Sequence, residues 1–185
     1  MSYLPSAPDT TLVDRFRHLP TLAAPLHEFA QQLMRGPSPF SALQRERIAA
    51  YVSDQNGCAF CRDSHNEVIV HLGGAPEPRP DSVDDDPLTP VLTFVSALNR
   101  EPENIGQADV DSVLAAGWDE DALEHAVLVC GFFNLMNRWV DGLGIPSDPE
   151  TVKMGGRMLY MKGYQAVIDM CTDRGDRQSQ AGQVP

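Results

Sequence analysis

The sequence predicts an all-α protein, and three observations support this fold class. Apolar residues recur three and four positions apart, the spacing of one helix face, through most of the 185 residues. Residues typical of helix starts and stops bound these segments. The sequence shows no strand-like alternation between hairpin turns. Hydrophobic residues make up 42% of the chain, which is enough to build a core.

The chain is expected to divide into three parts: an N-terminal arm (1–19), one helical domain (20–171) and a polar tail (172–185) that frays. No apolar run reaches the length of a transmembrane helix. The first residues show no basic segment followed by an apolar stretch, so we expect no signal peptide. A cytoplasmic protein, whose thiols stay reduced, is the expectation.

The first half of the domain is predicted to hold three helices. Thr21 is the expected cap of the first helix. Ser41, with Gln44 three residues later, has the spacing of a capping box for the second helix. Asn56-Gly57 is expected to end the second helix and reverse the chain. The three segments are 21–36, 41–57 and 58–74.

The second half is predicted to hold four helices, after a connection rich in Pro and Asp at 75–90. Asp84, Asp85 and Asp86 in this connection are expected to form a solvated loop. The segment 119–144 is apolar nearly all round, which indicates a place at the centre of the fold or in a subunit interface. The four segments are 87–102, 109–118, 119–144 and 148–170.

Charge and cysteine usage exclude several classes of protein. Lys and Arg number 14 and Asp and Glu number 26, so the formal net charge is −12. This charge argues against binding to nucleic acid and to anionic membranes. Four cysteines are too few for a disulfide scaffold. Only Cys58 and Cys61 are close in sequence, whereas Cys130 and Cys171 stand alone.

The pattern Cys58-x-x-Cys61-x-x-x-His65 carries the chemistry. At about 100° per residue, Cys61 and His65 lie about 60° and about 20° from Cys58 around a helix. The three side chains therefore share one face, and Asp63 and Glu67 fall on the opposite side. A helix start lowers a thiol pKa, which favours Cys58 as the more acidic thiol. A reactive dithiol with a nearby base is the leading interpretation.

Two other interpretations of this pattern stay open. The three residues could be buried core residues that align by chance. They could instead bind zinc, which needs a fourth ligand. His71 lies on the wrong side of the helix, and His125, Cys130 or Cys171 could approach only through the tertiary fold.

A fourth residue extends the pattern. Glu46 precedes Cys58 by twelve residues, and Glu46 together with Cys58-x-x-Cys61-x-x-x-His65 resembles the active-site pattern of alkylhydroperoxidase D-like (AhpD-like) proteins. These proteins belong to the carboxymuconolactone decarboxylase superfamily. Residues 43–61 resemble the helix-turn-helix entry to their site, and residues 132–146 resemble a stretch of the peroxidase-related branch.

The resemblance implies a helical bundle that assembles into trimers or hexamers, and a function as a thiol-dependent peroxidase without haem, flavin or metal cofactor. Cys61 would attack hydrogen peroxide or an organic peroxide, and Cys58 would resolve the sulfenic acid as a disulfide. His65 and Glu46 would form a proton relay through water. A lipoyl-carrying or thioredoxin-like protein would reduce the disulfide.

Two rival functions remain. One is a decarboxylase-type member of the superfamily, although such members generally lack the cysteine pair. The other is a non-catalytic oligomeric module that binds zinc or a partner protein.

Three further residues carry expectations. Phe60 stands where some members of the family have a proton-handling residue, and a phenyl ring cannot transfer a proton. We therefore expect Phe60 to pack or to form an apolar wall for an alkyl peroxide. Asn137 and Arg138 are polar groups on an apolar segment, and we expect them to brace the site or a subunit contact.

Overall fold

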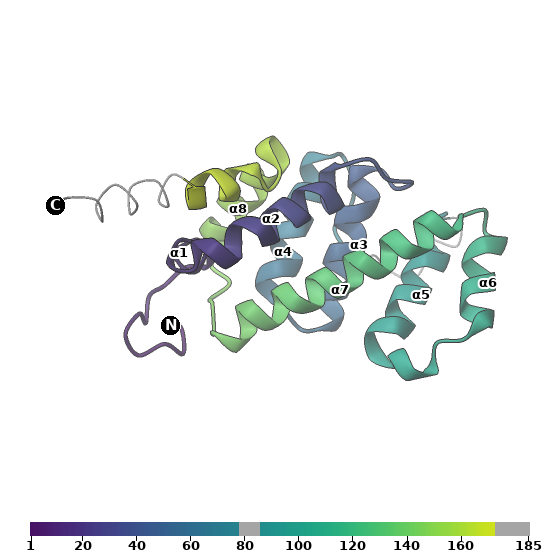
Figure 1. The fold of residues 1–185 in the computed structure, drawn as a ribbon, viewed down its shortest axis with the longest axis horizontal. Coiled ribbons are helices and arrows are strands. Elements are labelled where there is room, and N and C mark those ends of the chain that lie inside the picture. Colours follow the sequence, from purple (N-terminus) through teal and green to yellow (C-terminus); the bar gives the residue numbers. More distant parts are fainter. Residues whose placement is uncertain (78–85, 173–185) are drawn as a thin grey trace.

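The computed structural model describes residues 1–77 and 86–172, and the regular elements in these two ranges are all helical (Figure 1). The fold class predicted from the sequence is thus confirmed. The helices are α1 (Leu12–His18), α2 (Pro20–Arg35), α3 (Ala42–Gln55), α4 (Ala59–His71), α5 (Thr89–Arg100), the short 3₁₀ helix η1 (Pro102–Asn104), α6 (Gln107–Ala115), α7 (Glu120–Gly142) and α8 (Pro149–Lys162).

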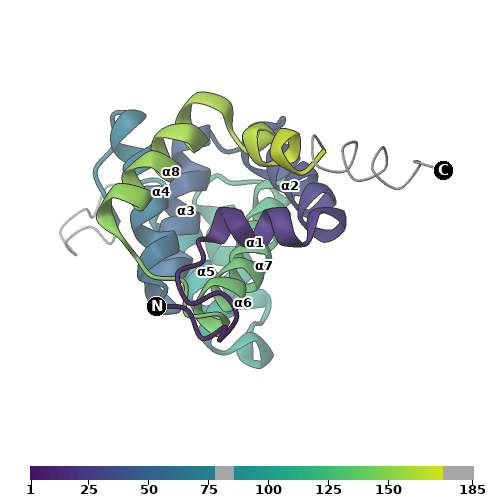
Figure 2. The same cartoon turned by 90° about the vertical axis from the view of Figure 1, so that its left-hand side faces the viewer.

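Helix α3 lies at the centre of the packing and contacts α2, α4, α5 and α7. Helices α1 and α2 lie toward one end of the bundle, and α5 and α6 form the other end (Figure 1). Helix α8 lies over α4, as the view along the bundle shows (Figure 2). The core is apolar and contains fully buried side chains from α3 and α7, among them Ile48, Val52 and Val129.

Several local predictions are confirmed. The Ser41 hydroxyl accepts from the backbone N–H of Gln44 at 3.2 Å, and the Gln44 side chain accepts from the backbone N–H of Ser41 at 2.9 Å. These two bonds form the capping box of α3. Asn56 caps the C-terminus of α3 and Cys58 is the N-cap of α4, as the sequence predicts.

Other predictions are wrong at the helix ends. Thr21 does not cap α2, because the helix begins at Pro20, and Leu19 as N-cap offers no side-chain bond. Proline suits the first helical position because its missing N–H has no partner there in any case. The segment 148–170 is not one helix. Helix α8 ends at Lys162, and a second helical stretch covers 165–172 after Gly163.

The N-terminal and Asp-rich segments carry more structure than expected. The region 1–19 contains α1, which buries Leu12 and Phe16 in the core. Asp86 is not solvated but pairs with Arg47 at 2.5 Å, with 8% of its side chain exposed. Asp84 and Asp85 lie outside the described residues.

Helix α7 is buried on one face only. Along the rest of α7, Val127, Leu128 and Leu135 are 38%, 45% and 47% exposed. An apolar stripe of this kind leaves room for a subunit contact. None of the helices in the described ranges combines the length and apolar character that a membrane-crossing segment needs.

Gly156 allows α8 to approach α4 closely. A Cβ atom at residue 156 would lie 2.5 Å from Cβ of Glu67, a distance that real side chains do not tolerate, and 3.0 Å from the carbonyl oxygen of Ser64, which is a tight contact. The neighbouring Gly155 has no described atom within 4 Å of such a Cβ. The two adjacent glycines therefore differ sharply in what an added methyl group meets.

We expect Gly156→Ala to lower the free energy of unfolding by about 1–3 kcal/mol, because α8 must move away from α4. Gly155→Ala is the matched control and should raise it by about 0.5–1 kcal/mol, since alanine favours the helix. Urea denaturation followed by circular dichroism measures both. Equal effects at the two positions would contradict the close packing described for Gly156.

Candidate active site

The turn between α3 and α4 places the two thiols. Gly57 adopts a φ of +73°, a conformation that favours glycine, and the backbone N–H of Cys58 then donates to Ser53 O at 2.9 Å. This turn brings α4 back along α3 within three residues. Cys58 and Cys61 are both free thiols at the start of α4.

Asn137 braces this turn from α7. The Asn56 amide donates to the Asn137 side-chain oxygen at 2.8 Å, and the Asn137 amide donates to the Ser53 hydroxyl at 3.0 Å. Asn137 therefore braces the turn that precedes Cys58, which agrees with one of the two roles expected for it. Arg138 instead donates back to Asn134 on its own helix, to the backbone oxygen at 2.9 Å and the side-chain oxygen at 2.6 Å.

Glu46 and His65 form a buried pair. Glu46 is completely buried on α3, and its Oε2 lies 2.5 Å from Nδ1 of His65 on α4. Burial raises the pKa of the Glu46 carboxyl, but His65 and Arg35 outweigh burial and hold that pKa below its ordinary value. The carboxylate is therefore the acceptor, and Nδ1–H of His65 is the donor. The Nε2 atom of His65 remains for exchange of a proton at the cavity described below.

Arg35 is the second partner of Glu46. Its Nη2 lies 2.6 Å from Glu46 Oε1, and the guanidinium also donates to the carbonyl oxygens of Met34 and Leu159. Arg35 is the last residue of α2, and its contacts with Glu46 and Leu159 join α2 to α3 and to the end of α8. The sequence analysis missed Arg35, because nothing in the sequence places the end of α2 beside α3.

The setting of Glu46 also differs from that of a solvated helix charge. Its neighbours Arg45 and Arg47 are buried too, at 5% and 8% exposure. Arg45 donates to the carbonyl oxygens of Leu33 and Gly36, and Arg47 pairs with Glu77 at 2.6 Å. The whole charged segment of α3 therefore faces into the protein and is paired there.

The two thiols have different environments. Cys58 is completely buried, whereas Cys61 is 6% exposed and lines a cavity. A hydrogen bond with Cys61 and burial raise the pKa of the Cys58 thiol. The expectation that the helix start lowers the pKa of the Cys58 thiol is therefore wrong. Burial and the neighbouring sulfur outweigh the helix dipole at this position.

The cavity beside Cys61 has a volume of about 450 Å³. Side chains from α1, α2, α4, α7, α8 and the stretch after α8 line it, and most of them are apolar. Phe60 forms part of its wall, as the sequence predicts. The polar side chains in its lining include Ser64, His65, His27 and Tyr164. The cavity can therefore hold a small organic molecule against the Cys61 thiol and the His65 imidazole.

Residues that sequence reasoning did not assign complete this cavity. His27 donates Nδ1–H to Ala23 O at 2.7 Å, and burial lowers its pKa, so this imidazole is neutral. Tyr164 comes from the segment after α8 and is 6% exposed. Neither residue lies in a motif, and both reach the site only through the packing of distant helices.

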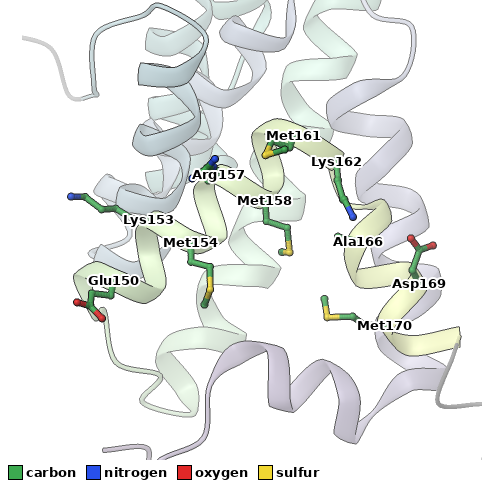
Figure 3. Close-up of a pocket in the computed structure, with 10 residues that line it drawn as sticks. All are labelled: Glu150, Lys153, Met154, Arg157, Met158, Met161, Lys162, Ala166, Asp169 and Met170. Atoms are coloured by element: carbon green, nitrogen blue, oxygen red, sulfur yellow. The ribbon is translucent and has the colours of Figure 1, made fainter.

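A second hollow lies on the outer side of α8 (Figure 3). Its volume is about 810 Å³, and Figure 3 shows Met158 and Met170 pointing toward the space between α8 and the helical stretch after it. Lys153, Arg157 and Lys162 also line it. Its lining contains neither a cysteine nor a histidine, unlike that of the cavity beside Cys61.

No group of three or more His, Cys, Asp and Glu side chains within residues 1–77 and 86–172 is arranged to hold a metal ion. His65 already binds Glu46 through Nδ1. His71 lies 3.6 Å from Glu67 and stacks on Tyr160, and His125 donates Nε2–H to Leu33 O at 2.9 Å. These histidines therefore have partners of their own.

Fold and site together define an all-helical protein with a buried dithiol, a Glu–His pair and an apolar cavity. The sequence matches no protein-family model and no curated protein. Solved structures share the fold. An uncharacterized peroxidase-related protein from Silicibacter sp. TM1040 is similar with a TM-score of 0.67 and 24% identity, over 75% of this chain and 76% of that one.

A second similar structure is described as an alkylhydroperoxidase AhpD core, an uncharacterized peroxidase-related protein from Ralstonia eutropha JMP134. Its TM-score is 0.63 at 18% identity, over 77% of this chain and 78% of that one. The chain therefore has the AhpD-like fold that the resemblance in its sequence implies.

Proposed function

We propose that this protein is a thiol-dependent peroxidase that cycles Cys58 and Cys61 between dithiol and disulfide. One observation carries the proposal: Cys61 faces an apolar cavity together with His65, and the buried Glu46 carboxylate binds Nδ1 of that histidine. A nucleophile, a base and a residue that orients the base are the parts that covalent catalysis needs.

The first step forms an S–O bond and breaks the peroxide O–O bond. The Cys61 thiol gives its proton to Nε2 of His65, and the thiolate attacks one peroxide oxygen. The leaving alkoxide then takes the proton from Nε2 and departs as the alcohol. Glu46 and Arg35 hold His65 in the tautomer that allows this exchange. The products are the Cys61 sulfenic acid and an alcohol.

The second step joins the two thiols. The Cys58 sulfur attacks the sulfur of the Cys61 sulfenic acid, an S–S bond forms, and the hydroxyl group leaves with the Cys58 proton as water. The burial of Cys58 supports its role as the resolving thiol, because peroxide in the cavity meets Cys61 first. The effect of Cys61 on the pKa of the Cys58 thiol supports the proximity of the two sulfur atoms.

The cycle requires an external dithiol, which is oxidised as the Cys58–Cys61 disulfide is reduced. A lipoyl-carrying or thioredoxin-like protein of the cytoplasm has this chemistry. Exposed apolar side chains on α7 and α8, including Leu135, Met154 and Met161, support assembly into a homo-oligomer. No haem, flavin or metal is required by these steps.

Steady-state assays of the purified protein test the proposal. With an organic hydroperoxide and excess dihydrolipoamide, we expect repeated consumption of peroxide. Without the dithiol, one equivalent should be consumed and peptide mapping should find a Cys58–Cys61 disulfide. Stoichiometric bound zinc that blocks thiol titration would overturn the proposal and favour the zinc-binding alternative.

A further inference from the structure

Tyr164 carries a buried hydroxyl group for which the fold provides no partner. The residue is 6% exposed, and its hydroxyl oxygen has no hydrogen-bond partner among the described residues. An unmade hydrogen bond of a buried polar group costs about 1–3 kcal/mol. The hydroxyl group therefore does not stabilise the fold. A molecule that enters the cavity beside Cys61 could supply the missing hydrogen-bond partner.

The position of Tyr164 points to that partner. The tyrosine lines the same cavity as Cys61 and His65. Its hydroxyl group is close enough to Cys61, Glu46 and Arg35 to interact with each electrostatically. A molecule that reacts with Cys61 therefore lies beside Tyr164.

The chain holds Tyr164 in place with dedicated contacts. Gly163 ends α8 with a φ of +58°, and the backbone N–H of Tyr164 then donates to Gln31 Oε1 at 2.7 Å. A Cβ atom at residue 163 would lie 2.5 Å from that same oxygen. The ring lies beside His27, with 6.1 Å between ring centroids.

The hydroxyl group stays protonated at its site. Burial, and then the negative charge of Glu46, raise the pKa of Tyr164 well above its ordinary value. A neutral phenol is a hydrogen-bond donor, and a donor aimed at an oxygen that gains negative charge stabilises the transition state.

We propose that the Tyr164 hydroxyl group donates a hydrogen bond to the peroxide oxygen that leaves as Cys61 attacks. This inference rests on the proposed peroxidase function. The tyrosine transfers no proton and changes no oxidation state. It stabilises the developing alkoxide until Nε2 of His65 delivers the proton. Phe60 cannot provide such a donor, so Tyr164 offers the polar group that residue 60 lacks.

Tyr164→Phe tests the inference, because it removes the hydroxyl oxygen alone. We expect the second-order rate constant for tert-butyl hydroperoxide to fall by about 10²-fold, the usual loss for one such donor. The midpoint of thermal unfolding should stay equal or rise, since no internal hydrogen bond is lost. Tyr160→Phe is the matched control: Tyr160 is 44% exposed and stacks on His71, and its rate should be unchanged.

The leaving group gives a readout that a structural role would not change. The loss in Tyr164→Phe should be larger for an alkyl hydroperoxide, whose alkoxide is strongly basic, than for a peracid, whose carboxylate is weakly basic. An equal loss for both substrates, or a lower unfolding midpoint, would overturn the inference.

The two proposals fail in different ways. Should the wild-type protein consume peroxide while Tyr164→Phe keeps its full rate, only the role of Tyr164 is wrong. Should the wild-type protein consume no peroxide and form no disulfide, the peroxidase proposal and the inference both fall.

Discussion

Cys61→Ser is expected to reduce peroxide consumption to the uncatalysed background. A serine hydroxyl is not a useful nucleophile toward an O–O bond, and Cys61 is the thiol that lines the cavity. The measurement is the consumption of an organic hydroperoxide in the presence of excess dithiol. Cys130→Ser is the control: Cys130 is buried outside the cavity lining and should keep the wild-type rate.

Cys58→Ser should fail at a later stage than Cys61→Ser. One equivalent of peroxide is still consumed, because Cys61 is intact, but the sulfenic acid has no neighbouring thiol to resolve it. Mass spectrometry should find one added oxygen atom on the peptide that contains Cys61. Dimedone should trap the sulfenic acid on that residue. The opposite result would be a dimedone adduct on Cys58 in the Cys61→Ser protein, with peroxide consumed at the wild-type first-turnover rate. It would show that Cys58 attacks the peroxide and Cys61 resolves the sulfenic acid.

Glu46→Gln is expected to reduce both stability and rate. The substitution removes the negative charge that pairs with Arg35 and His65 in a completely buried position. Removing one partner of a buried ion pair usually costs about 3–5 kcal/mol, and Arg35 keeps two carbonyl acceptors, so we expect about 3 kcal/mol. His65 loses the charged acceptor that favours its tautomer and stabilises its protonated form, and we expect the rate to fall by about 10²-fold.

Glu77→Gln separates these two effects. Glu77 is buried to a similar extent and pairs with Arg47 at 2.6 Å, but it does not line the cavity. We expect it to lower the free energy of unfolding while leaving the peroxide rate unchanged. Equal losses of rate in both variants would show that destabilisation alone explains the effect of Glu46→Gln.

The stabilising effect of Glu46 should depend on pH. Its folded-state pKa lies below the ordinary value of 4.5, so its contribution is complete above that pH. The contribution is lost as pH falls from about 4.5 through the folded-state pKa, because the carboxyl group binds a proton more readily in the unfolded chain than in the folded protein. The difference in unfolding free energy between wild type and Glu46→Gln should therefore be constant near neutral pH and shrink in acid. Urea denaturation at several pH values measures this difference.

Local sequence signals predicted most of the helices, because helix spacing and capping depend on neighbours within a few residues. The capping box of Ser41 and Gln44 and the turn at Asn56-Gly57 are of this kind. The same reasoning failed where a tertiary contact decided the outcome. Gly163 divides the last helix, and the chain then turns to place Tyr164 against Gln31. Gly163 directly after Lys162 is a local helix-stop signal, whereas its tertiary partner Gln31 has none.

The sequence by itself determined that the protein is helical and that Cys61 and His65 share one face of α4, since both follow from periodicity along the chain. Its resemblance to the AhpD-like pattern added Glu46. Only the tertiary structure decided that Glu46 is buried against His65 and Arg35, that Cys61 rather than Cys58 faces the cavity, and that Tyr164 reaches it. Burial and charge pairing arise from packing between distant helices. The pKa of each group depends on those neighbours and not on its position in the chain.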